Sequence, residues 1–504
     1  MNILFVSAEA DPFAKVGGLA DVVGSLPKAL RQMGIDARVL MPLYGFIDRS
    51  RFDIQPLTAF DVVRRTGTTR VDLYTTTYDD VPIYFLHAPP YFGQEASVYS
   101  NWDFDMPRFI FFCQAVPDAA DVLRDRIGWF PDVFHVNDWH TGLVPFLLTQ
   151  RRVNPGWEQA GTMVTIHNMA YQGEYAGGWM WEQGIPARDH AELQSRGLTD
   201  NMLGIALAYS DSITTVSPRY AIEIQYPYMG YGLEGLLNTR LSDLRGILNG
   251  IDMDLWDPQT DPHIVSNYNA ASFTDCRLPN KRHLQLEAGL PMRDDVPVIG
   301  LVTRLVYQKG LDLAFPALRE ILSTHDVQFI GLGSGEPQYN DAFRQLAIDF
   351  PTKAQAFVSY NGALAQRIYA GCDIFLMPSH YEPCGVGQMI AMRYGALPLV
   401  RETGGLADTV SNYDDGEADA GTGFVFAWEE AQAVAGTLRW ALWTYHNRPE
   451  AWGRMQARAM QTDFSWRKSA AEYKTLYQTI IDRHLIIRDV DIGDSSTEGT
   501  GDNG

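Results

Sequence analysis

Short, uninterrupted apolar segments recur along both halves of the chain, most of them followed by a polar or glycine-bearing turn. Continuous apolar strands separated by segments with helical spacing are typical of a mostly parallel sheet covered on both faces. The pattern therefore predicts an α/β fold. The segments lie at residues 3–6, 37–41, 81–86, 133–136, 163–166 and 212–216, and then at residues 297–302, 327–332, 356–359, 374–377 and 397–400.

The repetition of this pattern predicts two doubly wound, Rossmann-like domains. A stretch rich in Gly, Asn, Asp and Pro, from Gly246 to Pro258, is suited to a crossing, so we expect domains at residues 1–248 and 249–465. Ligands of open α/β sheets bind beyond the carboxyl ends of the strands, and we therefore expect the chemistry in a cleft between the domains. Residues 489–504 contain two aliphatic side chains and no Lys or Arg, which predicts a disordered acidic tail.

Composition excludes several classes of protein. The 504 residues carry 61 acidic and 40 basic side chains, a formal net charge of −21. Nucleic acid and anionic membranes require a positive surface, so neither is expected as a partner. No segment approaches the ~18 apolar residues of a membrane span, and the first residues lack the pattern of an export signal. The four cysteines show no CxxC pair, which fits a reducing, cytoplasmic location without a zinc site.

Two glycine clusters follow predicted strands. Lys15, Gly17 and Gly18 stand between a strand and a helix, where backbone N–H groups and the helix start favour an anion such as phosphate. The cluster fits neither the Walker A nor the dinucleotide motif, and a tight turn with a solvated lysine is the alternative. The second cluster, residues 331–335, has the wrong glycine spacing for a nicotinamide dinucleotide.

The second half places two cations and another glycine turn after strands. Arg304 and Lys309 follow the strand at 297–302, where a forked donor and a point charge could clamp a diphosphate. Taken alone they could also be two surface cations. The turn formed by Thr403, Gly404, Gly405 and Leu406 offers further N–H donors at a helix start. Together these features favour a diphosphate ligand.

Two further loops carry groups that could react or bind. Glu382 follows a strand and could accept hydrogen bonds from sugar hydroxyls, or could simply complement a helix start. The run from His135 to His140 combines two imidazoles, a carboxylate and an indole at a strand end. No third ligand at a recognisable spacing accompanies them, so we expect no metal site.

The motifs in this order resemble those of the bacterial glycogen synthases and plant starch synthases. The resemblance covers nearly all of residues 1–485 and implies the GT-B architecture, in which two Rossmann-like domains face an interdomain cleft. A C-terminal helix, residues 466–488, is expected to cross back to the first domain. The motifs lie at residues 15–21, 135–142, 165–173, 246–252, 304–310, 379–385, 394–410 and 421–424.

The resemblance implies transfer of glucose from ADP-glucose to the non-reducing end of an α-1,4-glucan (glycogen) primer, with retention of configuration. ADP-glucose is a substrate, and no cofactor or metal is expected. Catalytic roles fall on Glu382, His140, Lys309, Arg304 and Lys15. Donor contacts are assigned to Lys15, Gly17, Gly18, Asn249, Arg304, Lys309, Tyr360, Glu382, Cys384, Gly385, Thr403, Gly404, Gly405 and Leu406.

Within this set, Arg304 and Lys309 would neutralise the departing diphosphate and Glu382 would hold the donor glucose. Tyr360 matches the position whose ring stacks on adenine. The acceptor side and active-site loop are assigned Asp21, Asp138, Asn168 and Gln172. Many relatives carry an aspartate where this chain has Phe104, so either Asp103 or Asp105 could take its place.

The mechanism that the resemblance implies is a front-face displacement. A double displacement would need a nucleophile on the opposite face, and no carboxylate suggests itself for that role. Two alternatives stay open: a related retaining transferase with another nucleotide sugar or acceptor, and a non-catalytic protein that binds glucan or nucleotide sugar. The sequence leaves the oligomeric state and the choice between ADP- and UDP-glucose open.

Overall fold

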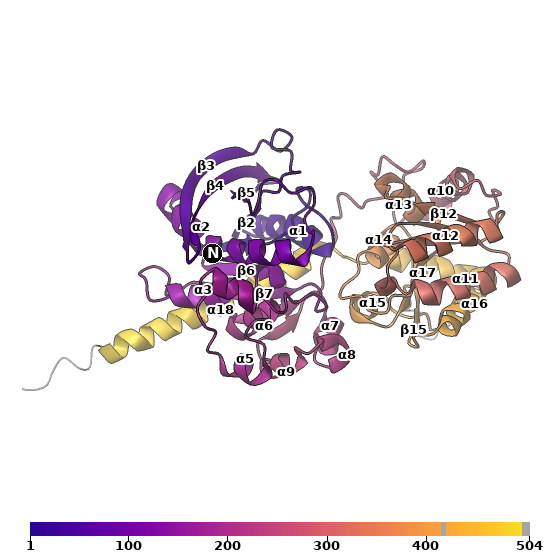
Figure 1. Ribbon diagram of the computed structural model, residues 1–504. Helices are drawn as coiled ribbons and strands as arrows, with labels where there is room; N and C mark the ends of the chain where they lie inside the picture. The colour runs from indigo at the N-terminus through magenta and orange to yellow at the C-terminus, as the bar shows by residue number, and fades with distance from the viewer. Residues whose placement is uncertain (415–419, 496–504) are drawn as a thin grey trace, which may run out of the picture. The chain divides into compact units, whose positions relative to one another are not determined.

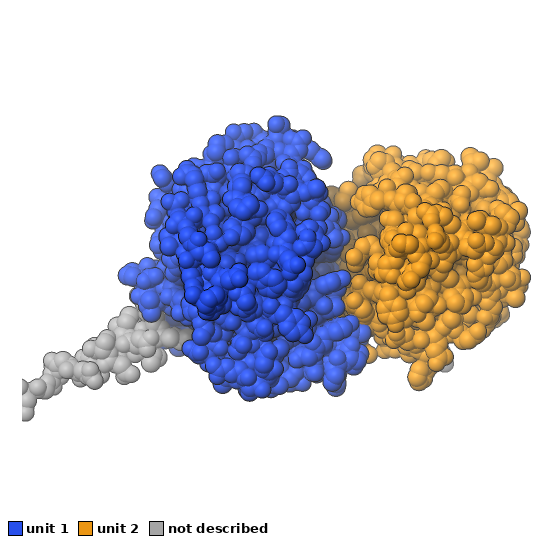
Figure 2. Space-filling view, in the orientation of Figure 1, with its two compact units in different colours: residues 1–216, 221–250, 466–504 blue, residues 217–220, 251–465 orange. Residues whose placement is uncertain are grey.

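The computed structural model describes residues 1–414 and 420–495 and divides into two compact units (Figures 1 and 2). Unit 1 comprises residues 1–216, 221–250 and the chain from 466 onward, and unit 2 comprises residues 217–220 and 251–465. Each unit is built on its own largely parallel sheet with helices. The predicted α/β fold with two doubly wound halves is confirmed.

The sheet of unit 1 has the strand order β3-β4-β5-β2-β1-β6-β7-β8-β9. Residues 3–6 of β1 and every residue of β6 and β7 are buried, as expected for strands covered on both faces. Its strands are β1 (Asn2–Val6), β2 (Asp36–Pro42), β3 (Gln55–Arg64), β4 (Gly67–Tyr78), β5 (Val81–His87), β6 (Val133–Asn137), β7 (Gly161–Ile166), β8 (Ser212–Thr215) and β9 (Leu244–Gly246).

Strands β3 and β4 form an antiparallel hairpin at one edge of this sheet, and β4 pairs antiparallel with β5. The sequence analysis did not predict this hairpin. Its strands interrupt their apolar residues with polar ones and are largely half-buried or exposed, so they lack the continuous apolar runs that marked the parallel strands.

Helices of unit 1 connect these strands. Helix α1 packs against β2 and against α18, and α3 packs against α2 and α6. The helices are α1 (Gly18–Gln32), α2 (Trp102–Ile127), η1 (Trp139–Thr141), α3 (Val144–Arg151), α4 (Gly177–Glu182), α5 (Ala191–Arg196), α6 (Met202–Tyr209), α7 (Pro218–Glu223), α8 (Pro227–Gly230), α9 (Glu234–Asn238) and α18 (Trp466–Ser495).

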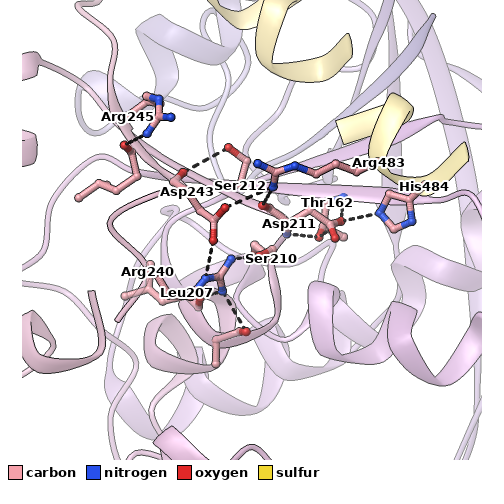
Figure 3. A network of polar contacts seen from close by, with 12 residues as sticks. Thr162, Leu207, Ser210, Asp211, Ser212, Arg240, Asp243, Arg245, Arg483 and His484 are labelled. Carbon is pink, nitrogen blue, oxygen red and sulfur yellow. Dashed lines mark hydrogen bonds and ion pairs between the residues drawn. The ribbon is translucent and has the colours of Figure 1, made fainter. Parts of the chain in front are cut away.

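Helix α18 packs on β6 and β7 of unit 1. The hydroxyl of Tyr477 lies 2.7 Å from Nδ1 of His135 in β6. Further along α18, Arg483 and His484 bind Asp243 and Asp211 in the network of Figure 3. Here His135, part of the polar run noted in the sequence, serves to anchor a helix.

Helix α18 continues to Ser495, beyond the predicted end at residue 488. The prediction of disorder therefore differs from the structure over residues 489–495, and its remainder, 496–504, lies outside the described residues. The polar composition did not indicate this extension. Adding a residue to an existing helix forms a further hydrogen bond, whereas an isolated polar segment must first nucleate a helix.

The sheet of unit 2 has the order β12-β11-β10-β13-β14-β15, with every neighbouring pair parallel. Its strands are β10 (Val298–Val302), β11 (Gln328–Gly333), β12 (Ala354–Val358), β13 (Ile374–Met377), β14 (Leu397–Arg401) and β15 (Phe424–Phe426). Its helices are α10 (Phe273–Glu287), η2 (Tyr307–Lys309), α11 (Leu311–Thr324), α12 (Pro337–Asp349), α13 (Gly362–Gly371), α14 (Gly387–Arg393), α15 (Gly404–Thr409), α16 (Ala431–Asn447) and α17 (Pro449–Gln461).

The chain passes between the units at residues 250–251 and 465–466. At these points the amide of Ile251 donates to the carbonyl of Phe464, and the Ser469 hydroxyl donates to the carbonyl of Leu248. The first crossing thus falls after Gly250 rather than after residue 248, and residues 217–220, which were expected in the first domain, pack with unit 2.

Candidate active site

In the sheet of unit 2, the order in which successive strands are added changes direction between β10 and β13. Strands β11 and β12 extend it on one side of β10, and β13, β14 and β15 extend it on the other. Because all these strands are parallel, the loops that follow β10 and β13 leave the same edge side by side. Such a switch point is where doubly wound folds bind ligands. The loops here are residues 303–310 and 378–386.

Glu382 lies at this switch point with its charge compensated by Lys309. The Nζ of Lys309 is 2.6 Å from Oε2 of Glu382, and the Ser379 hydroxyl donates to the same oxygen at 3.0 Å. Glu382 is 6% exposed, so these partners offset the hydration that its carboxylate loses on burial. The structure thus brings together two residues that are 73 positions apart, a carboxylate and a cation.

The glycines that follow β14 allow two loops to pack backbone against backbone. A Cβ at Gly404 would lie 1.9 Å from the carbonyl oxygen of Glu382, and one at Gly405 would lie 2.0 Å from that of Cys384. The Gly405 amide donates to the Glu382 carbonyl at 3.1 Å. In this structure the glycine turn holds the Glu382 loop in place, and the Gly405 N–H is already engaged.

The other predicted donor contacts around Glu382 are also packed into the protein. Cys384 is buried, and Gly385 has a φ of 72°, which favours glycine. The Gln388 amide nitrogen donates to both of their carbonyls, at 3.1 and 3.0 Å. Thr403 and Leu406 are buried at the start of α15, where the Leu406 amide donates to the Thr403 carbonyl.

Arg304 and Tyr360 lie on loops at the same edge of the sheet and are exposed. Arg304 follows β10, and its guanidinium makes no ion pair or hydrogen bond with the rest of the described chain. Tyr360 follows β12, and the side chain is 92% exposed. The structure therefore places a cation and an aromatic ring, both available to a ligand, on either side of β11.

In unit 1, the loop from Lys15 to Gly18 is fastened to a residue that the sequence analysis overlooked. The amides of Val16 and Gly17 donate to Oε2 of Glu9, at 2.7 and 3.0 Å. These N–H groups are thus bonded within the protein. Lys15 is exposed, and its Nζ lies 2.5 Å from Oδ1 of Asp21, which binds it to the start of α1.

Burial raises the pKa of Asp21, and its pairing with Lys15 acts in the opposite direction. The other oxygen of Glu9 accepts from the Tyr99 hydroxyl at 2.5 Å. Burial, followed by the nearby Glu9, raises the pKa of Tyr99 well above its ordinary value, so it stays a donor.

His140, in η1 after β6, is held in an aromatic box. The Tyr99 ring stacks on it with centroids 5.1 Å apart, and Phe109 and Trp139 approach at 4.8 and 4.3 Å. Burial lowers the pKa of His140 to about 3, and Arg108 acts in the same direction. The imidazole is therefore neutral near pH 7, with one donor and one acceptor nitrogen.

Asp138 precedes His140 in an unusual backbone conformation, with a φ of 53°. Its Oδ1 accepts from the amides of His167 and Asn168, at 2.7 and 3.5 Å, which ties the loop after β6 to the loop after β7. Burial raises the pKa of Asp138 to about 7, although these backbone bonds oppose the rise. Asn168 is itself half-buried and caps a turn at Ala170.

Three of the residues assigned to the acceptor side, Gln172, Asp105 and Asp103, differ in how far they are exposed to solvent. Gln172 is buried, and its amide bonds to the carbonyls of Met169 and Tyr231 and to the side chain of Asn201, so it is a structural contact here.

Asp105 is buried against the guanidinium of Arg108, whereas Asp103 is exposed in the first turn of α2.

Asn249 is 9% exposed, and its Oδ1 has no hydrogen-bond partner in the described part of the chain. A buried acceptor without a donor is costly, so this oxygen is suited to a ligand hydroxyl.

Sequence reasoning missed Glu9, Tyr99 and Ser379, which fix the predicted residues in place. Ser379 lies inside the motif around Glu382 and could have been included. Glu9 and Tyr99 are 90 positions apart and meet only in the folded unit, so no local pattern joins them.

The described residues contain neither a group of metal ligands nor a membrane-spanning helix. Over residues 1–414 and 420–495, no three His, Cys, Asp or Glu side chains are grouped as a metal ion would require. Among the described helices, none has the length and apolar character needed to cross a membrane.

The paired parallel sheets, and the loops with Lys309 and Glu382 at a switch point, define a glycosyltransferase of the GT-B class. Residues 2–239 match the family model of the starch synthase catalytic domain, and residues 285–457 match that of glycosyl transferases group 1. The chain belongs to the glycogen synthase and starch synthase family, as the sequence analysis predicted.

The similarity to relatives extends over the whole chain. A glycogen synthase of Syntrophotalea carbinolica is 42% identical over 96% of this chain and 100% of its own length. One of Geobacillus thermodenitrificans is 42% identical over 97% of this chain and 100% of its own length. The predicted enzyme class is therefore confirmed.

Solved structures agree with this assignment. The catalytic domain of starch synthase IV from Arabidopsis thaliana, bound to ADP and acarbose, has a TM-score of 0.86 and 33% identity, covering 95% of this chain and 99% of that one. A sucrose-phosphate synthase from Thermosynechococcus elongatus has a TM-score of 0.60 at 18% identity, with 96% and 99% coverage, and shares the fold.

Proposed function

We propose that this enzyme transfers glucose from ADP-glucose to the non-reducing end of an α-1,4-glucan, with retention of configuration and release of ADP. The observation that carries the proposal is the Lys309–Glu382 pair at the switch point of unit 2, 2.6 Å between charged atoms, with the unpaired guanidinium of Arg304 on the same loop as Lys309. The starch synthase neighbour bound to ADP and acarbose supports the same substrate classes.

The two cations would act on the leaving group. As the bond between the anomeric carbon and the diphosphate breaks, negative charge grows on the phosphate oxygen, and fixed positive charges stabilise it. Lys309 has three N–H donors, so its ammonium can hold Glu382 and a phosphate oxygen at once. Arg304 can add a forked pair of hydrogen bonds to the diphosphate.

Glu382 would bind the hydroxyls of the donor glucose. Its carboxylate can accept hydrogen bonds from a sugar and favours the positive charge that develops on the ring as the diphosphate departs. In a front-face displacement the acceptor hydroxyl attacks from the side that the diphosphate leaves, and the departing phosphate takes the proton. This step retains the configuration without a protein nucleophile.

The remaining assignments follow the same chemistry. Tyr360 presents a free ring to adenine, and Asn249 presents an unpaired carbonyl oxygen to a hydroxyl. In unit 1, Lys15 adds a further cation and neutral His140 a hydrogen-bonding group near the anomeric carbon. The proposal requires no metal or other cofactor, because the protein's own cations meet the diphosphate. A neutral glucan and a net charge of −21 fit a cytoplasmic enzyme without nucleic acid or membrane partners.

The test compares ADP-glucose and UDP-glucose as donors with glycogen as acceptor, measuring release of nucleoside diphosphate. We expect ADP release that depends on glycogen, and labelled glucose that β-amylase, which cuts α-1,4 bonds from the non-reducing end, recovers as maltose. Release from neither donor would overturn the proposal. Binding without turnover in calorimetry would instead indicate a non-catalytic binding protein.

A further inference from the structure

His380 lies between two carboxylates in the loop that carries Glu382. Its Nε2 is 2.7 Å from Oδ1 of Asp312, at the start of α11, and its Nδ1 makes a short contact with Oε1 of Glu429, which follows β15. The imidazole is 6% exposed, whereas both carboxylates reach the surface. One buried ring therefore joins three segments of unit 2.

These two contacts require a particular protonation state. A carboxylate is only an acceptor, so each ring nitrogen must carry a proton to bond to its partner. Neutral imidazole has a single N–H, and the two hydrogen bonds can exist together only in the imidazolium form. Such charge-assisted bonds are about twice as strong as neutral ones.

The charged groups around the His380 ring are compatible with a positive charge on it. Arg401, at the end of β14, donates to the carbonyls of Ser379 and His380 and lies 4.0 Å from Glu429. The Tyr307 ring stacks on the imidazole with centroids 4.2 Å apart. With His380 protonated, two cations face two carboxylates. Loss of the proton takes this cation away from Asp312 and leaves Glu429 with Arg401, 4.0 Å away.

The same residue joins the two loops of the active site. The His380 amide donates to the carbonyl of Gln308 at 2.9 Å, and Tyr307 stands between Arg304 and Lys309 in that loop. Glu382 follows His380 by two positions. The ring thus lies in the loop that carries Glu382 and packs on Tyr307 of the loop that carries Lys309, although it does not touch either charged residue in any contact among the described residues.

We propose that His380 is a positioning residue whose protonated ring fixes the Lys309–Glu382 pair for transfer, so that activity falls as the ring loses its proton. The effect on rate rests on the proposed transferase function, but the protonation of the ring does not. We expect activity to fall as the pH rises, because the cationic ring is the form that supports transfer and it loses its proton at higher pH.

The test combines kinetics with spectroscopy on the full chain. The kcat for ADP-glucose and glycogen is measured from pH 5.5 to 9 for the wild type and for His380→Gln and His380→Arg. We expect a fall in the wild-type kcat at the alkaline side. Glutamine should lower kcat by about 10²-fold with a smaller change in KM and should abolish the fall, because small misplacements have effects of that size. Arginine, which stays charged, should keep more activity and also abolish the fall.

The matched control is His446→Gln, an exposed histidine of unit 2, which should retain the wild-type profile. Histidines labelled at Cε1 give NMR signals for the 11 imidazoles, and the signal lost in His380→Gln identifies this ring. It should change from the imidazolium to the neutral shift over the same pH range as kcat.

The outcomes separate this inference from the proposed function. If the wild type transfers no glucose from any nucleotide sugar, the proposed function fails, while the NMR signal still reports whether the ring is an imidazolium. If the wild type is active but His380→Gln keeps its kcat and pH profile, or the ring is already neutral at pH 5.5, the positioning role is overturned. If His380→Gln does not fold, the signal lost in His380→Arg identifies the ring, and the NMR result for the wild type still decides the matter.

Discussion

Lys309 and Glu382 neutralise each other across 2.6 Å although they come from loops that follow different strands of unit 2. We expect Lys309→Ala and Glu382→Gln each to lower kcat/KM by about 10³-fold or more, because each removes a group that acts on the transition state. The double variant should lose far less than the product of the two, since the residues act together.

Assays of nucleoside diphosphate release measure these losses. Arg344→Ala, which breaks an exposed pair with Asp341 in the same unit, is the control and should keep wild-type rates. Near-normal turnover of folded Glu382→Gln would remove this residue from the mechanism.

Tyr360→Ala should raise the KM for ADP-glucose while leaving the melting temperature unchanged. The ring is 92% exposed and contributes little to folding, but stacking on a base is worth about 1–3 kcal/mol, which corresponds to roughly a 5- to 150-fold change in KM. Ile348→Ala, an exposed position on α12, serves as the control. An unchanged KM in Tyr360→Ala would place adenine elsewhere.

Asp138→Asn should alter the pH dependence of stability. Burial raises the pKa of Asp138 to about 7, so between about pH 4 and 7 the folded protein holds a proton that the unfolded chain has released. The free energy of unfolding therefore falls as pH rises through this range. The variant does not titrate in this range. Its free energy of unfolding, relative to that of the wild type, should therefore increase by up to about 1.4 kcal/mol for each unit by which the pH is raised. Urea unfolding at pH 5 and 7 measures it, and parallel curves would contradict the assignment.

Unit 1 should lose stability in acid through three buried histidines. Burial lowers the pKa of His135, His140 and His167 to about 3. Below about pH 6.5 the unfolded chain protonates its histidines while the folded protein does not, so stability falls as pH decreases towards 3. His140→Gln should reduce this slope by one proton, or about 1.4 kcal/mol per pH unit, in urea titrations between pH 4 and 6. An unchanged slope would show that His140 titrates normally.

His484→Ala should loosen the C-terminal part of α18. Burial alone would raise the pKa of Asp211, but its bonds to His484, Arg152 and Thr162 outweigh burial and lower it. A lowered carboxyl pKa contributes stability at neutral pH that is lost as pH falls through the folded value. We expect a loss of about 1 kcal/mol and faster amide exchange in α18 at pH 7. Arg483→Ala, at a half-exposed neighbour in Figure 3, should cost less. Equal exchange rates in wild type and His484→Ala would show that this pair does not hold the helix.

The sequence was sufficient to predict most of the parallel strands and the residues that follow them, because buried parallel strands and glycine turns have local signatures. The three-residue parallel strands β9 and β15 were not predicted. The hairpin of β3 and β4 was missed, since its mixture of polar and apolar residues resembles that of exposed loops. The motif residues Lys309 and Glu382 were predicted individually, but their 2.6 Å contact depends on the order of β10 and β13 in the sheet, which no local pattern encodes.

The hydrogen bonds inside the protein could not be predicted from the sequence either. The amides of Gly17 and Gly405 were expected to face a diphosphate, yet in the structure they bond to Glu9 and to the Glu382 carbonyl. Glycine patterns report where backbones come close, and they do not report whether the neighbour is a ligand or another loop. For the same reason the sequence around His380 does not indicate its two partners, Asp312 and Glu429, which are 68 and 49 positions away in the chain.

Unit 1 is discontinuous in the chain, because α18 completes it only after the whole of unit 2 has been made. On the ribosome, which synthesises the N-terminal part first, His135 and Asp211 must wait for Tyr477 and His484 to emerge more than 200 residues later. The nascent first unit therefore exposes the surface of β6 and β7 that α18 will cover, and it is during this interval that the protein most needs protection from aggregation.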